Sequence, residues 1–174
     1  VQTIMLVATY FGIEEINWTG SNKTKGLIVS ILLIQLIAIL GAEIMARMAG
    51  KFGNIKVLIA VNILWALICL YAFTIHTPTQ FYITAAAVGL VMGGIQALSR
   101  STYSKLLPDG ITDTASFFSF YDVTEKIGIV IGMFVYGITS QSFGSIRFAV
   151  VLFIVFFLKA IFLLYRIPKK DLYL

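Results

Sequence analysis

Residues 27–48 read LIVSILLIQLIAILGAEIMARM, and this stretch decides the class of fold. Its charged side chains, Glu43 and Arg47, both lie near its C-terminal end. A helix needs about 20 mostly apolar residues to cross the ~30 Å hydrocarbon core of a bilayer. The stretch therefore predicts a helix that spans a membrane.

The composition of the whole chain agrees with this prediction. The chain has 174 residues, of which 59% are apolar and only 12% are charged, and its mean hydropathy is +0.95. Soluble domains carry about 25% charged residues, and a domain of this size leaves roughly a third of its chain surface accessible to water. The composition therefore excludes a soluble globular enzyme, a disordered chain and a linker, and it makes lipid the main solvent.

The same apolar pattern recurs along the chain and predicts an all-α membrane protein, organised as one transmembrane domain over residues 1–174. Backbone groups in lipid find partners only in a helix or a closed barrel, and the alternating ten-residue strands of a barrel are absent from the sequence. The first span is short and begins at Val1 in apolar sequence, so we expect a fragment with a clipped first helix. The six expected spans are 1–16, 27–48, 57–75, 81–100, 117–137 and 148–165.

Turn and capping residues separate these spans. Thr77 followed by Pro78 predicts a helix N-terminus, and Asp113 or Thr114 is expected to cap the fifth helix. The other expected breaks are Gly20-Ser21-Asn22, Gly50 with Gly53, and Pro108-Asp109-Gly110.

Basic residues are unequally divided between the two sides of the predicted bundle, which gives its orientation. If the C-terminus is cytoplasmic, the inner segments carry eight basic residues and the outer segments carry three, as the positive-inside rule requires. The net charge of +5 is then mostly a signal of topology, and no feature supports a nucleic-acid partner. The eight are Arg47, Lys51, Lys56, Arg100, Lys105, Arg166, Lys169 and Lys170, and the three are Lys23, Lys25 and Arg147.

Two Asn-x-Thr sequons begin at Asn17 and Asn22, in the first outer loop. In a eukaryotic secretory protein both are acceptors for N-glycosylation. Chance occurrence in a polar loop is the alternative and the simpler interpretation.

The sequence carries no signature of an enzyme. It contains one cysteine, Cys69, and one histidine, His76, which together cannot form a disulfide or a metal cage. There is no glycine-rich phosphate loop and no set of Ser, His and Asp for nucleophilic catalysis. We therefore expect no enzymatic activity, no cofactor and no metal.

Glycines at four-residue spacing mark two predicted helix-packing faces. Close approach of backbones holds membrane helices together, and small residues permit it. Gly89, Gly93 and Gly94 mark the fourth span, and Gly128 and Gly132 mark the fifth. Bending at Gly93-Gly94, as part of a gate, is the alternative to simple packing.

Charged residues within the spans are candidates for function, because they are costly at membrane depth. Asp122, Glu125 and Lys126 cluster in the inner part of the fifth span, where Asp122 and Lys126 are four residues apart and are expected to pair. This cluster is either a relay or cytoplasmic gate, or a salt bridge near the headgroups that only fixes the helix position.

Other polar residues in the spans leave similar alternatives open. Arg100 ends the fourth span and is either an interfacial anchor or part of a gate. Gln35, in the middle of the second span, needs a hydrogen-bond partner and is a candidate for lining a cavity. Glu14 and Glu15 are interface residues or the outer lip of a pathway, and Glu43 with Arg47 is an anchor or a gate.

Several stretches resemble one family of transporters. Residues 93–101, GGIQALSRS, resemble the GG-x-Q-A-x-S-R-S stretch in the tenth helix of the vacuole effluxer family, a branch of the major facilitator superfamily related to the autophagy-related vacuolar amino-acid effluxer. Residues 117–122, FFSFYD, look like the family's FF-x-x-Y entry to the eleventh helix, and residues 1–4 resemble part of its seventh. The loop 47–56 resembles the superfamily's basic loop, with Gly50 in the place of the acidic residue.

This resemblance implies that the chain is helices seven to twelve of a twelve-helix transporter, built as two inverted three-helix repeats. Such a protein moves a small-molecule solute across the lipid bilayer by alternating access, with the N-terminal six-helix half as its partner. The implied cargo is amino acids, proton coupling through Asp122 or Glu125 is plausible, and the membrane is the plasma membrane in a bacterium or the vacuolar membrane in a fungus. A membrane-embedded binding or scaffold module and a self-pairing half-transporter are the alternatives.

The resemblance also implies a division of roles, since the first, second, fourth and fifth spans of such a half face the cavity. The expected cavity residues are Gln35, Gln96 and Tyr121. The expected inner gate or coupling residues are Arg100, Asp122, Glu125 and Lys126.

Overall fold

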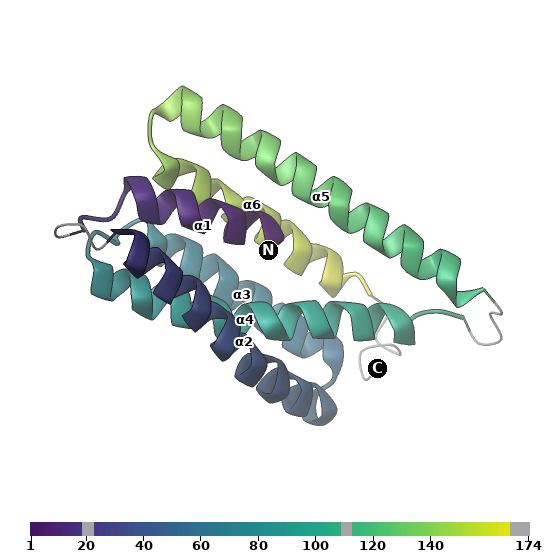
Figure 1. Ribbon diagram of the computed structural model, residues 1–174. Coiled ribbons are helices and arrows are strands. Elements are labelled where there is room, and N and C mark those ends of the chain that lie inside the picture. The colour runs from purple at the N-terminus through teal and green to yellow at the C-terminus, as the bar shows by residue number, and fades with distance from the viewer. Residues whose placement is uncertain (19–22, 109–112, 168–174) are drawn as a thin grey trace.

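The chain forms a bundle of helices in a computed structural model that describes residues 1–18, 23–108 and 113–167. Figure 1 shows the helices running back and forth along one common direction, with α5 on one side of the bundle. Six helices lie in the described residues: α1 (Gln2–Glu14), α2 (Lys23–Phe52), α3 (Asn54–Ala72), α4 (Pro78–Lys105), α5 (Thr114–Phe143) and α6 (Ile146–Tyr165).

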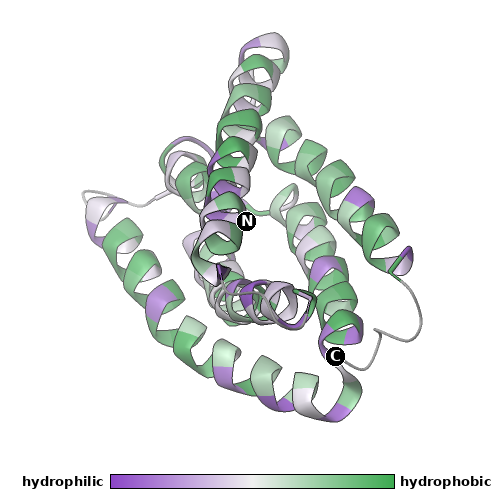
Figure 2. Cartoon of the chain, turned by 90° about the vertical axis from the view of Figure 1, so that its right-hand side faces the viewer, coloured by the Kyte–Doolittle hydropathy of each residue, from purple (hydrophilic) through white to green (hydrophobic). Residues whose placement is uncertain are grey.

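Five of these helices, α2 to α6, are long and apolar enough to cross a membrane. α1 has 13 residues, which gives it a length of about 20 Å, short of the hydrocarbon thickness. Hydrophobic residues predominate along most of the helices (Figure 2), and large apolar side chains are exposed on them: Leu36, Ile39 and Phe134 are each more than 60% exposed. The described part of the chain is thus all-helical, with a surface suited to lipid.

Several helices extend beyond the spans expected from hydropathy. α4 begins at a capping box, in which the Thr77 side chain accepts from the Gln80 backbone and the Gln80 side chain accepts from the Thr77 backbone. α5 begins at Asp113, whose side chain accepts from the Ser116 N–H. Hydropathy detects only the apolar part of a helix. The backbone hydrogen bonds of the helix extend further, as far as capping residues such as these.

Glycines end two of the helices. Gly144, with φ of 64°, is the left-handed C-cap of α5. Gly53, with φ of 89°, is the one residue between α2 and α3. Gly50 was expected in this turn but lies inside α2, so the break is shorter than predicted. The expected turns at Gly20-Ser21-Asn22 and Asp109-Gly110, the sequon at Asn22, and Lys169 with Lys170 lie outside the described residues.

α2 and α4 pack closely because small residues face each other along their contact. A Cβ added at Gly89 would lie 2.6 Å from the Ile34 carbonyl oxygen, and one at Gly93 would meet the Ala38 carbonyl oxygen. Gly94 faces the Met45 side chain, and Gly41 faces the Leu90 backbone from the α2 side. The three glycines expected to mark a packing face on the fourth span therefore lie against α2, joined by Gly41, which the sequence analysis missed.

α5 is held more loosely and packs on α6 and α1. Its buried residues are Gly132 and Thr139. A Cβ at Gly132 would lie 2.5 Å from the Thr3 hydroxyl oxygen of α1, whereas one at Gly128 would have no described atom within 4 Å. Gly132 thus packs as expected, but the contact expected at Gly128 is not made within the described chain.

The apolar core centres on α3, which packs on α6 and α4. Trp65 is completely buried, and its ring is stacked on Phe157 of α6, with centroids 5.6 Å apart and planes 7° apart. This core holds α3, α4 and α6 together as the base on which α1 and α5 rest.

Candidate functional site

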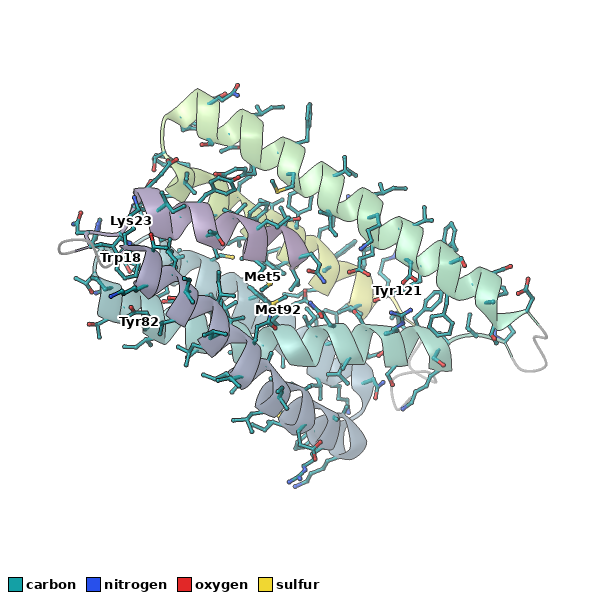
Figure 3. All side chains as sticks on the ribbon, viewed as in Figure 1. Met5, Trp18, Lys23, Tyr82, Met92 and Tyr121 are labelled. Carbon is teal, nitrogen blue, oxygen red and sulfur yellow. The ribbon has the colours of Figure 1, made fainter. Side chains whose placement is uncertain are left out.

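A polar cavity lies between the C-terminal half of α4 and the N-terminal half of α5. It has a volume of about 840 Å³, and we call it the α4–α5 cavity. Figure 3 shows Tyr121 in the space between the two helices. The residues that line it are Gln2, Gln96, Ala97, Arg100, Ser101, Ser104, Phe118, Tyr121, Asp122, Glu125 and Lys126.

A second cavity of about 340 Å³ adjoins the first and is more apolar. The two share Gln2, Gln96, Tyr121 and Glu125, which stand at the boundary between them. The second continues toward α3 and α6, where its walls include the aromatic side chains of Phe153, Phe156 and Phe157. Together they offer one polar and one apolar compartment, an arrangement typical of small-molecule sites.

Arg100 is one of the basic residues that line the α4–α5 cavity, and it lies opposite Asp122. Its Nη2 is 3.4 Å from the Asp122 Oδ1, and both side chains are about half exposed. An ion pair with this exposure contributes only about 0–1 kcal/mol, because water screens it. The contact therefore joins α4 to α5 weakly enough to open at little cost.

Aromatic rings surround the Arg100 guanidinium. It lies 5.5 Å from the Phe118 ring centroid and 6.0 Å from that of Tyr121, distances at which a cation is attracted to the ring face. Tyr103 of α4 lies against the same two rings, at 5.8 Å and 5.1 Å, and its hydroxyl donates to the Phe117 carbonyl at 3.0 Å. These contacts position the guanidinium beside the cavity without burying it.

Glu125 is the carboxylate at the boundary of the two cavities. It is partly buried, and its Oε1 accepts from the Gln2 Nε2 at 3.5 Å, which links α5 to α1. An ionisable group in a membrane-spanning helix is costly unless it has partners or water nearby. Glu125 is therefore placed where a solute or a proton can reach it from the open side.

The structure brings six of the seven expected cavity and gate residues to this one place: Gln96, Arg100, Tyr121, Asp122, Glu125 and Lys126. Gln35 is not among them, because it lies on the exposed surface of α2 and lines neither cavity.

The expected pairing within the fifth span needs correction. Asp122 is paired with Arg100 of α4, and Lys126 is exposed and lines the same cavity. Spacing along one helix predicts a possible pair, but a guanidinium from the neighbouring helix reaches this carboxylate instead. Glu43 and Arg47, by contrast, do form a pair within one helix, at 2.8 Å on the exposed surface of α2.

Gln2 also lines both cavities, although it was not expected in the site. A polar side chain in an apolar span is the same signal that drew attention to Gln96, but Gln2 lies at the start of the chain and was used only for the resemblance. Asn62 was not expected in the site either; it is a buried α3 residue that lines the apolar cavity and donates to the Leu58 carbonyl at 2.8 Å.

A second ionic cluster, also missed, lies at the opposite end of the bundle around Arg147. This side chain is 10% exposed, and its Nε donates to the Glu15 Oε2 at 2.6 Å. Its other nitrogens donate to the carbonyls of Phe73 at 2.7 Å and Ile75 at 2.6 Å, and one lies 3.2 Å from the His76 Nδ1. Arg147 thus joins the ends of α1, α3 and α6.

The sequence analysis treated Arg147 as a loop charge, and a signal for the cluster was present. An arginine in the first turn of an apolar helix needs an acidic partner, and Glu14-Glu15 supplies one at the same predicted end. Of these two carboxylates, Glu15 joins the cluster and Glu14 is exposed. This cluster ties helix ends together and lines neither cavity.

Within the described ranges, no group of three or more His, Cys, Asp and Glu residues is placed to hold a metal ion. The side chains that line the α4–α5 cavity offer a guanidinium, an ammonium group, carboxylates, amides and aromatic faces. These groups recognise a polar or charged solute by hydrogen bonds and charge.

Comparisons with known proteins match nearly the whole chain. A family model described as "Vacuole effluxer Atg22 like" matches residues 1–171. The "Uncharacterized MFS-type transporter YxiO" of Bacillus subtilis is 29% identical over 98% of this chain and 38% of its own length. Autophagy-related protein 22 of Kluyveromyces lactis is 29% identical over 95% of this chain and 34% of its own length.

The same protein of Vanderwaltozyma polyspora is 31% identical over 97% of this chain and 32% of its own length. The chain thus spans about a third of the length of these curated relatives. No solved structure matches the chain.

Proposed function

Because the chain belongs to the vacuole effluxer Atg22-like family of membrane transporters, we propose that it forms the C-terminal six-helix half of a secondary transporter of the major facilitator type. The chain is part of an integral membrane protein whose relatives are transporters and not enzymes. In the proposed half, α1–α3 and α4–α6 are two inverted three-helix repeats, and the N-terminal half supplies the other wall of the solute site.

The observation that carries this proposal is the gathering of polar side chains in the α4–α5 cavity, beside an apolar compartment. Arg100 and Lys126 give the cavity positive groups, Asp122 and Glu125 give it negative groups, and Gln96 and Tyr121 add hydrogen-bonding groups. A solute with both charges, such as an amino acid, fits this chemistry. The family description, vacuole effluxer, supports the vacuolar membrane as the proposed site of action in a fungus, and the plasma membrane is the proposed site in a bacterium.

The gate proposed for this pathway is the contact between Arg100 and Asp122, at the end of the bundle that carries the C-terminus and that we take to be cytoplasmic. α5 makes its main contacts with α6 and α1, and the exposed ion pair is a weak link from it to α4. Alternating access needs such a link to break and re-form in each cycle. Glu125, at the boundary of the cavities, is the residue proposed to carry the coupled proton.

The test is uptake of a labelled amino-acid mixture by the full-length protein in liposomes, with and without an imposed pH gradient. Uptake that the gradient accelerates is expected for the parent protein. Glu125→Gln is expected to abolish the acceleration while solute exchange at equal pH continues, because the amide still binds but carries no proton. Glu43→Gln, an exposed carboxylate outside both cavities, is the matched control and is expected to behave like the parent.

Two results would contradict the proposal. Intact, folded protein that moves no solute in either condition would favour a membrane-embedded binding or scaffold module. Gradient-driven uptake that survives Glu125→Gln would remove this residue from the coupling step.

A further inference from the structure

Asn62 is a buried polar side chain in the middle of α3, in the wall of the apolar cavity. It is 5% exposed, and its neighbours in this wall are the α6 side chains Phe153, Phe156 and Phe157. Among the described residues that α3 and α6 contribute to the cavity, Asn62 is the one with a polar side chain. A polar group at membrane depth is costly and is a candidate for function.

The protein satisfies only half of the Asn62 amide. The Nδ2 donates to the Leu58 carbonyl at 2.8 Å, which fixes the orientation of the amide, because a carbonyl needs a donor. The Oδ1 has no hydrogen-bond partner within residues 1–18, 23–108 and 113–167. A buried acceptor without a partner is destabilising, and the Leu58 carbonyl already accepts a backbone hydrogen bond within α3. The amide thus adds little to the fold and leaves one acceptor for a molecule in the cavity.

The aromatic wall beside Asn62 is held in place from behind. The Phe157 ring is stacked on Trp65, with planes 7° apart, and Trp65 is completely buried one helical turn after Asn62. Phe153 and Phe157 are themselves only 4% and 6% exposed. A fixed wall of this kind accepts an apolar group but offers it no hydrogen-bond acceptor, so Asn62 supplies the acceptor on this side of the cavity.

We propose that Asn62 is a specificity-determining residue, whose Oδ1 accepts a hydrogen bond from a donor on the apolar part of the solute. This inference rests on the function proposed above and narrows the solute to an amino acid whose apolar side chain carries a hydroxyl. The charged groups of this solute lie at the boundary of the two cavities, near Glu125, and its side chain lies against the phenylalanines. A side chain without the hydroxyl leaves the Asn62 acceptor unpaired, which a hydrogen-bonding site penalises.

The test measures binding and transport separately, with two pairs of solutes that differ by one hydroxyl: threonine with valine, and tyrosine with phenylalanine. Binding is measured as thermal stabilisation of the full-length protein in detergent by increasing solute, and transport as uptake in liposomes. The parent protein is expected to prefer the hydroxyl-bearing member of at least one pair by about fivefold, the effect of one hydrogen bond. Asn62→Leu, which has a similar branched shape without the amide, is expected to abolish this preference in both measurements.

Two further variants separate recognition from a structural role. Asn62→Thr keeps an acceptor, because a helix hydroxyl that donates to the preceding turn, as Thr102 does to the Leu98 carbonyl at 2.6 Å, retains a lone pair. It is expected to keep a preference for the hydroxyl, and complete loss of that preference would overturn the role of the acceptor. Gln35→Leu removes an amide from the middle of α2 that lines neither cavity, and it is expected to behave like the parent. An equal loss of preference with Gln35→Leu and Asn62→Leu would also overturn the proposal.

The outcomes keep this inference apart from the proposed function. Preferential binding without uptake would support the role of Asn62 and contradict transport. Uptake in which the parent distinguishes neither pair, or in which Asn62→Leu keeps the parent's preference, would overturn the role of Asn62 and leave transport standing. Neither binding nor uptake of any of the four solutes would contradict both.

Discussion

Replacing Gly89 by alanine tests the packing of α2 on α4, the closest helix contact in the bundle. The added Cβ would lie 2.6 Å from the Ile34 carbonyl oxygen and 3.0 Å from the Ile34 Cα. Ordinary contact begins at 3.4 Å, so the first of these distances is 0.8 Å too short. The obstructing atoms are backbone and cannot rotate away, so the two helices must separate along the contact.

The expected cost follows from two opposing effects. Forcing an extra methyl group into a well-packed interior typically costs about 1–3 kcal/mol. Alanine instead of glycine within a helix contributes up to about 1 kcal/mol in the opposite direction. Gly89→Ala is therefore expected to lower the free energy of unfolding by about 1–2 kcal/mol, since the steric effect is the larger.

The assay is equilibrium unfolding of the full-length protein in mixed micelles, with increasing mole fraction of a denaturing detergent. Gly50→Ala is the matched control, because Gly50 also lies in a helix of this pair but has no described atom within 4 Å of an added Cβ. It is expected to be neutral or slightly stabilising. Equal stability of Gly89→Ala and the parent, or equal destabilisation by both variants, would refute the reasoning.

Two further predictions concern the ends of the helices. Glu15→Gln is expected to lower the free energy of unfolding in the same assay by about 3 kcal/mol. Removing one partner of a buried ion pair costs about 3–5 kcal/mol, and the low end applies because carbonyl acceptors still hold Arg147. An unchanged stability would show that the pair is not buried in the membrane protein. Hydrogen bonds from the Ser116 side chain and backbone lower the pKa of Asp113 below its ordinary value of 3.8. The carboxylate therefore caps α5 fully above pH 3.8, and the cap is lost as the pH falls through the lowered pKa. Hydrogen exchange in the first turn of α5 is expected to show this loss of protection, whereas Asp113→Asn, which caps at every pH, should show none; the same pH dependence in both proteins would exclude Asp113 as its cause.

Hydropathy predicted the helices well because lipid leaves the backbone few alternatives. All six expected spans correspond to helices, but the ends were missed at Lys105 and Phe143. The end at Phe143 depends on Gly144 with its positive φ, a single residue outside the apolar stretch, whereas α4 ends before its C-cap Leu106, which has ordinary right-handed φ and ψ.

The candidate site was predictable as far as unusual residue types in apolar spans reveal it. Gln96 and Glu125 were found in this way, and the structure places them in one cavity. The residue pattern along one helix does not show which neighbouring helix each side chain faces. Gln35 was therefore expected in the cavity, but it lies on the exposed surface of α2.

The missed contacts join residues far apart in the chain. Arg147 and Glu15 are separated by 132 positions, and the contact of Gly41 with Leu90 forms only once α2 lies on α4. Local spacing carries no information about such pairs. They require knowledge of which helices are neighbours.

The central claim is that solute passes through the α4–α5 cavity, and uptake by Gln96→Ala tests it most directly. Gln96 lines both cavities, whereas Gln141, an exposed glutamine in the last turn of α5, lines neither. In the liposome assay with the full-length protein, Gln96→Ala is expected to lower uptake about fivefold at low solute concentration, the effect of one lost hydrogen bond of about 1 kcal/mol. Gln141→Ala is expected to leave uptake unchanged. Equal uptake by the two variants would contradict the claim that the solute binds in this cavity.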